Sequence, residues 1–252
     1  MSRVTDIPEI RSRLRADPVW GAYALCDLGP ALFPTTAWFT PDLALVLHAY
    51  GTCILFAMGT RSLAEAIDHV SWPCHLQLRE DAFDLLTSTL TLATDRTMWR
   101  MHWTDRRRAP GSRSGVAPLG PADVPLLRRL YADGESTGES PDFFMPSTVE
   151  DGTYFGMFEQ GVLVAAAGTH VLSREEGAAA IGNVYTRRDR RGRGYGRAVT
   201  GAVLGALGEI PVVVLNVRTD NPAAIRVYEA LGFERHCRFH EAVAVGPRVH
   251  LA

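Results

Sequence analysis

The sequence predicts an α+β fold in which a mixed, mostly antiparallel central sheet is flanked by helices. Short apolar runs rich in β-branched residues, separated by glycine-containing turns, predict hairpin strands. Other segments place apolar residues at helical spacing and predict amphipathic helices. The 252 residues are enough for one large domain or two small ones.

A charged segment without apolar periodicity, Asp105 to Ser114 (DRRRAPGSRS), predicts a linker or long surface loop. It divides the chain into a smaller N-terminal lobe, residues 1–110, and a second domain, residues 115–252. The predicted elements of the lobe are a helix over 7–15, strands over 43–48 and 53–58, helices over 61–70 and 81–89, and a strand over 97–103.

The lobe shows no catalytic constellation. Its histidines, His48, His69, His75 and His102, lack the spacing of metal ligands, and we interpret them as structural. The chain's four cysteines form no CxxC pair and are predicted to be free thiols, three of them in this half.

The second domain has a clearer pattern. A helix is predicted over 121–132, hairpin strands over 153–158 and 162–172, and a third strand over 178–186. A glycine-rich loop then leads into a helix that ends near Leu207, followed by a strand over 212–217. Asn221 as N-cap, Pro222 at the first position and Gly232 as terminator delimit the next helix, and a last strand begins near Glu234.

Composition excludes several classes of function. All 26 basic side chains other than histidine are arginine, and without lysine neither a Schiff base nor a Walker A phosphate site can form. The net charge of -2 gives no reason to expect attraction to nucleic acid or to an anionic membrane. The N-terminus lacks a signal-peptide core, and the apolar stretch Leu43 to Met58 is too short and broken to span a bilayer. We therefore expect a cytoplasmic protein.

The loop between the third strand and the following helix contains Arg191, Gly192, Arg193, Gly194, Tyr195 and Gly196. Helix-start amides lack intrahelical partners, and glycines let a backbone approach an anion closely, so this position favours phosphate. A dinucleotide fingerprint would need glycine where Arg197 stands. A glycine-rich turn with solvated arginines, or a nucleic-acid contact, remains open from the loop alone.

Two motifs together resemble the GNAT superfamily of N-acetyltransferases. Arg191, Gly194 and Gly196 fit its R-x-x-G-x-G acyl-CoA signature, and residues 221–233 (NPAAIRVYEALGF) fit its N-x-x-A-x-x-x-Y-x-x-x-G-F helix. The stretches 168–171 and 182–186 are similar to the glycine N-acyltransferase-like branch. The resemblance covers about residues 115–240, and the N-terminal half resembles the divergent half of some members of that branch.

The resemblance implies roles for the matched residues. The amides of residues 191–196 would hold the pyrophosphate of acetyl-CoA or another short acyl-CoA. The strand edge of Val184, Tyr185 and Thr186 would pair with the pantetheine amides. Asn221 would cap its helix and, as an open alternative, also touch the pantetheine arm. Tyr228 would donate a proton to the departing CoA thiolate, because a phenol is protonated at neutral pH.

The sequence departs from the family pattern at the general base. The strand Ala178 to Asn183 carries no carboxylate. We expect His170 to act as the base, directly or through water; Glu175 or Glu176 reaching in from the turn, and a water held by Asn183, are alternatives. An acceptor amine of low pKa would need no strong base.

The remaining expectations concern partners. Phe143, Phe144 and Met145 would line the acceptor site or belong to the core. His236 and His240 share a strand face, but no further ligand is visible and no metal is expected. The prediction is direct transfer of an acetyl or short acyl group to a small-molecule amine, with no nucleic-acid or membrane partner and with oligomeric state left open. The rival functions are a catalytically degenerate CoA-binding sensor and an arginine-based nucleic-acid binder.

Overall fold

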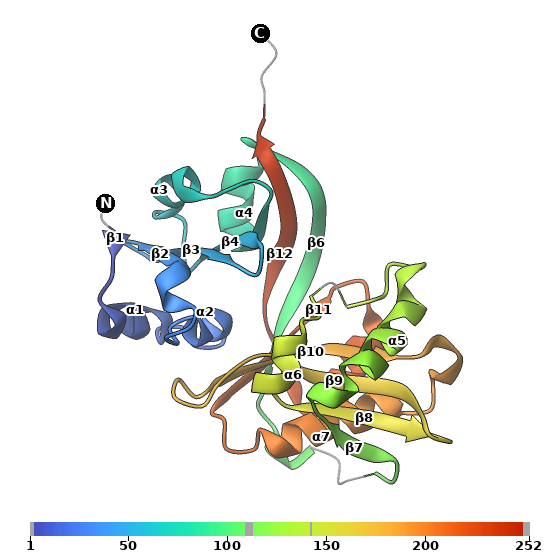
Figure 1. Cartoon of the computed structure of the whole chain (residues 1–252). Coiled ribbons are helices and arrows are strands. Elements are labelled where there is room, and N and C mark those ends of the chain that lie inside the picture. Colours follow the sequence, from blue (N-terminus) through green and yellow to red (C-terminus); the bar gives the residue numbers. More distant parts are fainter. Residues whose placement is uncertain (1–2, 109–112, 142, 249–252) are drawn as a thin grey trace. The chain divides into compact units, whose positions relative to one another are not determined.

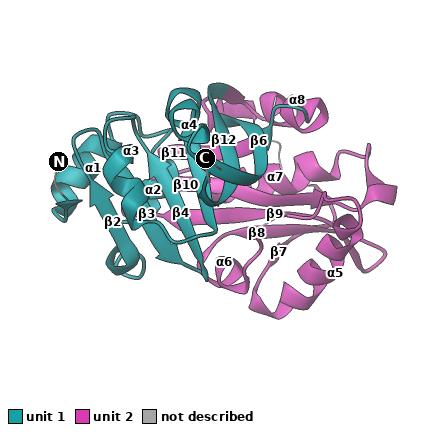
Figure 2. Ribbon diagram, turned by 90° about the horizontal axis from the view of Figure 1, so that it is seen from above, with its two compact units in different colours: residues 1–100, 217–220, 235–252 teal, residues 101–216, 221–234 magenta. Residues whose placement is uncertain are grey.

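A computed structural model describes residues 3–108, 113–141 and 143–248 of the chain. The chain forms two compact units, which Figure 2 shows in different colours. Unit 1 consists of Met1–Arg100, Val217–Asp220 and Arg235–Ala252, and unit 2 consists of Met101–Asn216 and Asn221–Glu234. The chain passes between them four times, and each unit has its own strands and helices.

Unit 1 is built on a sheet in which neighbouring strands pair in the order β1–β2–β3–β4–β5–β12. Only β4 and β5 run parallel; the other pairs that are resolved in register are antiparallel. The strands are β1 (Arg3–Val4), β2 (Thr36–Phe39), β3 (Ala44–Ala49), β4 (Thr52–Ala57), β5 (Cys74–Arg79), β6 (Leu90–Trp103) and β12 (Phe233–Pro247). The helices are α1 (Ile7–Leu14), α2 (Ala22–Cys26), α3 (Leu63–Ala66) and α4 (Glu80–Thr87), with short 3₁₀ turns at Phe33–Thr35 and Ile67–His69.

Unit 2 contains the strand order β11–β10–β9–β8–β7, antiparallel except for the parallel pair β10 and β11. Its strands are β7 (Val116–Leu119), β8 (Tyr154–Glu159), β9 (Val162–Ser173), β10 (Ala178–Thr186) and β11 (Val212–Arg218). Its helices are α5 (Val124–Glu135), α6 (Pro146–Asp151), α7 (Tyr195–Ala206) and α8 (Pro222–Ala230), with 3₁₀ turns at Arg106–Arg108, Pro121–Asp123 and Arg188–Arg190. Figure 2 shows α5 and α6 on one side of β8 and β9 and α7 on the other, so both faces of the strands are covered.

The predicted fold class is confirmed, since both units combine helices with a mixed, mostly antiparallel sheet (Figure 1). Several boundaries differ from the expectation. The predicted helix over 61–70 is shorter, because α3 ends at Ala66 and a 3₁₀ turn follows. The predicted strand over 97–103 begins at Leu90, and β2, β5, β7, α2 and α6 were not predicted. Residues 109–112 of the predicted linker lie outside the described residues.

The core of unit 2 that supports the site is aromatic. Tyr131 of α5, Tyr154 of β8 and Tyr185 of β10 are buried together with Leu127, Leu130 and Leu163. Phe144 packs edge-on against Tyr131, with ring centroids 5.0 Å apart. This aromatic cluster places three phenol hydroxyls beside the strands that carry the candidate site. Among the described residues, no helix is long and apolar enough to cross a membrane.

Candidate functional site

The predicted anion loop lies between β10 and α7. Gly192 and Gly194 adopt left-handed φ values of 77° and 75°, which glycine tolerates without strain. Gly194 is the N-cap of α7, and no side chain caps this end of the helix. The first amides of α7 therefore point out of the helix with the positive end of its dipole behind them. Such an arrangement suits a phosphate bound by backbone N–H groups.

Carboxylates neutralise most arginines around this loop. Arg191 pairs with Glu139 at 2.8 Å, and Arg193 pairs with Glu159 at 3.1 Å. Hydrogen bonds from Arg191 lower the pKa of Glu139, so this carboxylate stays charged. The exposed pairs contribute little to stability and can exchange partners. A phosphate would thus meet a loop whose arginines are already oriented, but it would compete with these carboxylates for them.

Strands β10 and β11 pair only over the first part of β10. Their parallel pairing runs from Ala178 opposite Val212 to Ile181 opposite Leu215 and is not continued beyond it. The backbone of β10 after Ile181 is therefore not engaged with β11. Val184, Tyr185 and Thr186 lie in this segment, so the strand edge predicted to pair with the pantetheine amides is present in the structure.

Two irregularities in the β9–β10 pairing create the polar centre of unit 2. The register skips His170 on β9, and it skips Asn183 and Val184 on β10. Asn183 adopts a positive φ of 52°, which asparagine tolerates better than most residues. These bulges turn His170 and Asn183 toward each other, and His170 Nε2 lies 3.2 Å from Asn183 Oδ1.

The hydrogen bonds continue from this pair in one direction. The Asn183 amide nitrogen donates to the Tyr154 hydroxyl at 2.6 Å. The Tyr154 hydroxyl lies 2.8 Å from Thr148 Oγ1, which in turn donates to the Met145 carbonyl at 2.7 Å. With the Asn183 nitrogen donating, its oxygen accepts, so His170 carries its proton on Nε2. Nδ1 is then the basic nitrogen of His170.

Burial lowers the pKa of His170 below its ordinary value of 6.5, while the hydrogen bond with Asn183 acts in the opposite direction. The imidazole is therefore neutral at pH 7 and able to accept a proton. The oxygen and the nitrogen of the Asn183 side-chain amide are both hydrogen-bonded inside the protein, and the residue is only 4% exposed. This geometry favours Asn183 as the group that orients His170.

The alternative carboxylates lie elsewhere on the hairpin. Glu175 and Glu176 belong to the turn between Ser173 and Ala178, which are paired in register. Asn183 lies five positions after Ala178, and a strand segment of that length spans about 16 Å. The turn therefore lies well away from Asn183 along β10, and Glu175 and Glu176 stay alternatives to His170.

Tyr228 lies on α8 and is buried to 8% exposure. Burial raises the pKa of its phenol to about 12, so the hydroxyl is fully protonated at neutral pH. Its ring packs edge-on against Phe233, with centroids 6.0 Å apart. At the start of the same helix, Asn221 Oδ1 accepts the Ala224 amide proton at 3.0 Å, which is the capping bond expected from the sequence.

Sequence reasoning missed several polar residues that hold the site. Tyr131 donates its hydroxyl proton to the backbone carbonyl of Asn183 at 2.9 Å. Asp133 accepts from the Tyr185 hydroxyl and from the Arg188 amide, both at 2.9 Å, and so ties α5 to the end of β10. The signal available in the sequence was glycine within strands, which marks a close approach. A Cβ at Gly168 would lie 2.4 Å from the Tyr154 ring, and one at Gly182 would lie 2.3 Å from the His170 ring.

The proposed acceptor wall is divided between core and surface. Phe144 packs with Tyr131 and Tyr154 in the aromatic cluster, whereas Phe143 is 44% exposed.

The two histidines of β12 pair with acids in unit 1: His236 with Asp17 at 3.0 Å and His240 with Asp95 at 2.7 Å. Within the described part of the chain, no cluster of three or more His, Cys, Asp or Glu side chains could hold a metal ion.

Comparisons with known proteins agree with this geometry. Residues 124–233 match the model of the acetyltransferase (GNAT) family. An uncharacterized protein of Mycobacterium leprae is 32% identical over 129 residues, which are 48% of this chain and 34% of that protein. A mycothiol acetyltransferase of Geodermatophilus obscurus is 42% identical over 67 residues, 25% of this chain and 22% of that protein. The alignments thus span only about a third or less of these curated relatives.

A solved structure resembles the chain over most of its length. The structure of a putative GNAT acetyltransferase from Novosphingobium aromaticivorans has a TM-score of 0.64 at 21% identity, covering 92% of this chain and 97% of that one. At this identity the likeness establishes the fold. The chain therefore has the fold of the GNAT acetyltransferases, whose general reaction is acyl transfer from acyl-CoA.

Proposed function

We propose that the chain is an N-acetyltransferase that moves an acetyl or short acyl group from acyl-CoA to a small-molecule amine by direct attack. The observation that carries the proposal is the combination of a left-handed glycine N-cap on α7 with a β10 edge released from β11. The first feature suits the pyrophosphate of CoA, and the second offers backbone groups to its pantetheine amides. A glycine-rich turn with no ligand would need neither the uncapped helix nor the strand separation.

The proposed chemistry needs a base for the amine and an acid for the thiolate. His170 is neutral and oriented by Asn183, so its Nδ1 takes the proton that the amine loses on attacking the thioester. Tyr228 is protonated and donates to the CoA sulfur as the tetrahedral intermediate collapses. The residues predicted for the cofactor are Val184, Tyr185, Thr186 and Asn221, together with the loop amides of Arg191 to Gly196. Positioning of the two substrates supplies the remaining rate enhancement.

The proposal also includes the branch of the family, the role of the N-terminal half and the cellular location. The stretches around Gly168 and Gly182 support the glycine N-acyltransferase-like branch, because both glycines admit the aromatic and imidazole rings that build the site. We place the divergent N-terminal half, residues 1–110, outside the acyl-CoA machinery and the protein in the cytoplasm. The reaction requires neither nucleic acid nor membrane, since no step of it uses such a partner.

Cofactor binding is tested first by thermal melting with acetyl-CoA, CoA and longer acyl-CoAs, with NAD and ATP as controls. A ligand that binds only the native state, at about a hundred times its dissociation constant, adds about 2.7 kcal/mol to the free energy of unfolding. A higher melting temperature with acyl-CoA, and none with NAD or ATP, supports the proposal. No shift at millimolar acyl-CoA would remove it.

Catalysis is tested by Tyr228→Phe, which keeps the ring and its packing on Phe233. The rate of acetyl transfer to a panel of amines, measured by the release of the CoA thiol, should fall by roughly 10²-fold or more while acetyl-CoA binding is unchanged. An unaltered rate would exclude Tyr228 as the acid. Binding without transfer in the wild-type chain, across the whole panel, would support the rival function of a CoA-binding sensor.

A further inference from the structure

Unit 1 contains a thiol pair that the sequence does not reveal. Cys53 of β4 and Cys74 of β5 are 21 positions apart in the chain, yet they lie directly opposite each other in the parallel pairing of these strands. Adjacent strands are about 4.8 Å apart, within the Cα separation of about 4.4–6.8 Å that a disulfide bridges. Both cysteines are free thiols.

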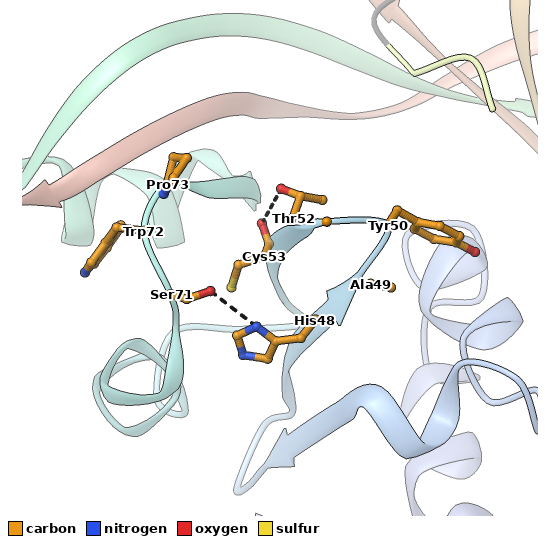
Figure 3. A pocket seen from close by; sticks show the side chains of 9 residues that line it. His48, Ala49, Tyr50, Thr52, Cys53, Ser71, Trp72 and Pro73 are labelled. Carbon is orange, nitrogen blue, oxygen red and sulfur yellow. Dashed lines mark hydrogen bonds between the residues drawn. The ribbon is translucent and has the colours of Figure 1, made fainter.

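One member of this pair opens onto a pocket. Cys53, but not Cys74, lines a cavity of about 410 Å³ whose wall includes His48, Tyr50, Ser71 and Trp72 (Figure 3). Cys74 is fully buried behind it. A small reagent entering the pocket therefore meets the sulfur of Cys53 first. Because Cys53 is itself only 1% exposed, a compact molecule has an advantage over a bulky one.

A base lies at the same pocket as this thiol. Ser71 and His48 line the pocket together with Cys53, and Ser71 Oγ lies 3.3 Å from His48 Nδ1. His48 Nε2 lies 3.2 Å from the carbonyl of His69, which can only accept, so Nε2 carries the imidazole proton and Nδ1 accepts from Ser71. Ser71 and His48, both in the pocket wall with Cys53, thus offer the Cys53 proton a path to a base.

These contacts divide the two thiols into different roles. The neighbouring Cys74 side chain lowers the pKa of Cys53, whereas the Cys53 side chain and burial raise the pKa of Cys74. A thiolate is the reactive form of cysteine, so Cys53 is the nucleophile and Cys74 the partner that remains protonated. A reactive thiol at a pocket with a second thiol beside it is the arrangement of a redox site with a resolving cysteine.

We propose that Cys53 and Cys74 form a thiol–disulfide redox site that is oxidised by a hydroperoxide entering the pocket of His48 and Ser71. The Cys53 thiolate attacks one peroxide oxygen; the S–O bond forms, the O–O bond breaks, and the leaving oxygen takes the proton held by His48. The Cys74 sulfur then attacks the Cys53 sulfenic acid, the S–S bond forms, and hydroxide departs as water with the Cys74 proton. The two thiols supply the two electrons that reduce the peroxide.

The test treats the full-length chain with hydrogen peroxide and maps its thiols by alkylation and mass spectrometry. Cleavage at Arg61 separates the peptides of Cys53 and Cys74, and fragment ions assign the link within residues 16–61, which contain Cys26 as well as Cys53. We expect this linked pair, reversible with dithiothreitol, to form at least about tenfold faster than oxidation of Cys26 or Cys237. Equal or faster oxidation of Cys26 or Cys237, both more exposed than Cys53, would overturn the proposal.

Two variants separate the roles of the groups. Cys74→Ser should stop at the sulfenic acid, which dimedone traps on Cys53, and Ser71→Ala should slow disulfide formation by roughly tenfold. Cys237→Ser is the matched control and should leave the rate unchanged. Disulfide formation at the wild-type rate in Ser71→Ala would refute the proton route, and over-oxidation of Cys53 without a link in the native chain would refute the resolving role of Cys74. The native-chain mapping decides the latter even where Cys74→Ser fails to fold.

Discussion

Replacing Gly182 by alanine tests whether His170 must hold its present position. An added Cβ would lie 2.3 Å from Cδ2 and Nε2 of the His170 ring, whereas ordinary contact begins at 3.4 Å. The ring must therefore move by about 1 Å, and its hydrogen bond to Asn183 cannot survive such a shift unchanged. Misplacement of a reacting group by about 1 Å can cost about 10²-fold in rate, and overpacking of this kind costs about 1–3 kcal/mol in stability.

The assay compares kcat/KM for acetyl transfer with the dissociation constant of acetyl-CoA and with the melting temperature. We expect Gly182→Ala to lose about 10²-fold in rate while acetyl-CoA binds normally, because residues 191–196 are untouched. Gly205→Ala is the matched control: a Cβ at this exposed position of α7 meets nothing within 4 Å, so the variant should keep its rate and gain about 0.5–1 kcal/mol.

A double-mutant cycle identifies the cause of the loss. In a His170→Ala background the added methyl group has no ring to displace, so Gly182→Ala should produce little further decrease in rate. Two outcomes would refute the reasoning. One is full activity of Gly182→Ala, and the other is an equal additional loss in the His170→Ala background.

Three further predictions follow from the loop, the helix cap and the histidine. Gly194→Ala forces alanine into a φ of 75°, which costs about 1–2 kcal/mol, and should weaken acetyl-CoA binding, measured by calorimetry, by roughly tenfold. The control is Gly161→Ala, which carries the same strain at a φ of 77° in the β8–β9 turn and should leave the binding unchanged. Asn221→Ala should lower the free energy of unfolding by about 1 kcal/mol, because it removes the cap of α8, and Asn221→Asp should restore it. If Asn221 also contacts the pantetheine arm, both variants should show a higher KM for acetyl-CoA. Because burial lowers the pKa of His170, kcat/KM should be independent of this group above about pH 6.5 and fall only below it. Asn183→Gly, which keeps the positive φ, should move that acid limb to lower pH, and a limb above pH 7 would contradict the assignment.

Sequence periodicity was sufficient where elements are local. The boundaries of β8, β9, β10 and α8 lie within a few residues of the prediction, because hairpin turns, an Asn-Pro start and a terminal glycine are encoded next to the elements they delimit. The strand β5 was missed although Cys74, Leu76 and Leu78 alternate with polar residues. Six residues of alternation are weak evidence by themselves, and this strand is held by its neighbours β4 and β12.

Side-chain partners across strands could not be predicted from spacing. The meeting of His170 with Asn183 depends on two bulges, and a bulge is a property of the register between strands. The same holds for Cys53 and Cys74, whose separation of 21 positions gives no hint that they are opposed. The sequence supplied the types of residue needed for acyl transfer, whereas the register decides which of them are neighbours.

The bulges also explain how an asparagine can stand where a carboxylate would be expected. Asn183 is turned inward, against the His170 ring and the Tyr154 hydroxyl, in a place that is nearly closed to solvent. A charged carboxylate there would bear a large desolvation penalty, and by attracting a proton to His170 it would raise the pKa of the imidazole. The neutral amide orients the ring with a hydrogen bond of the same geometry and leaves it unprotonated at pH 7. In the proposed mechanism the proton acceptor is the histidine of β9, which burial keeps neutral, and Asn183 on β10 has the task of orienting it.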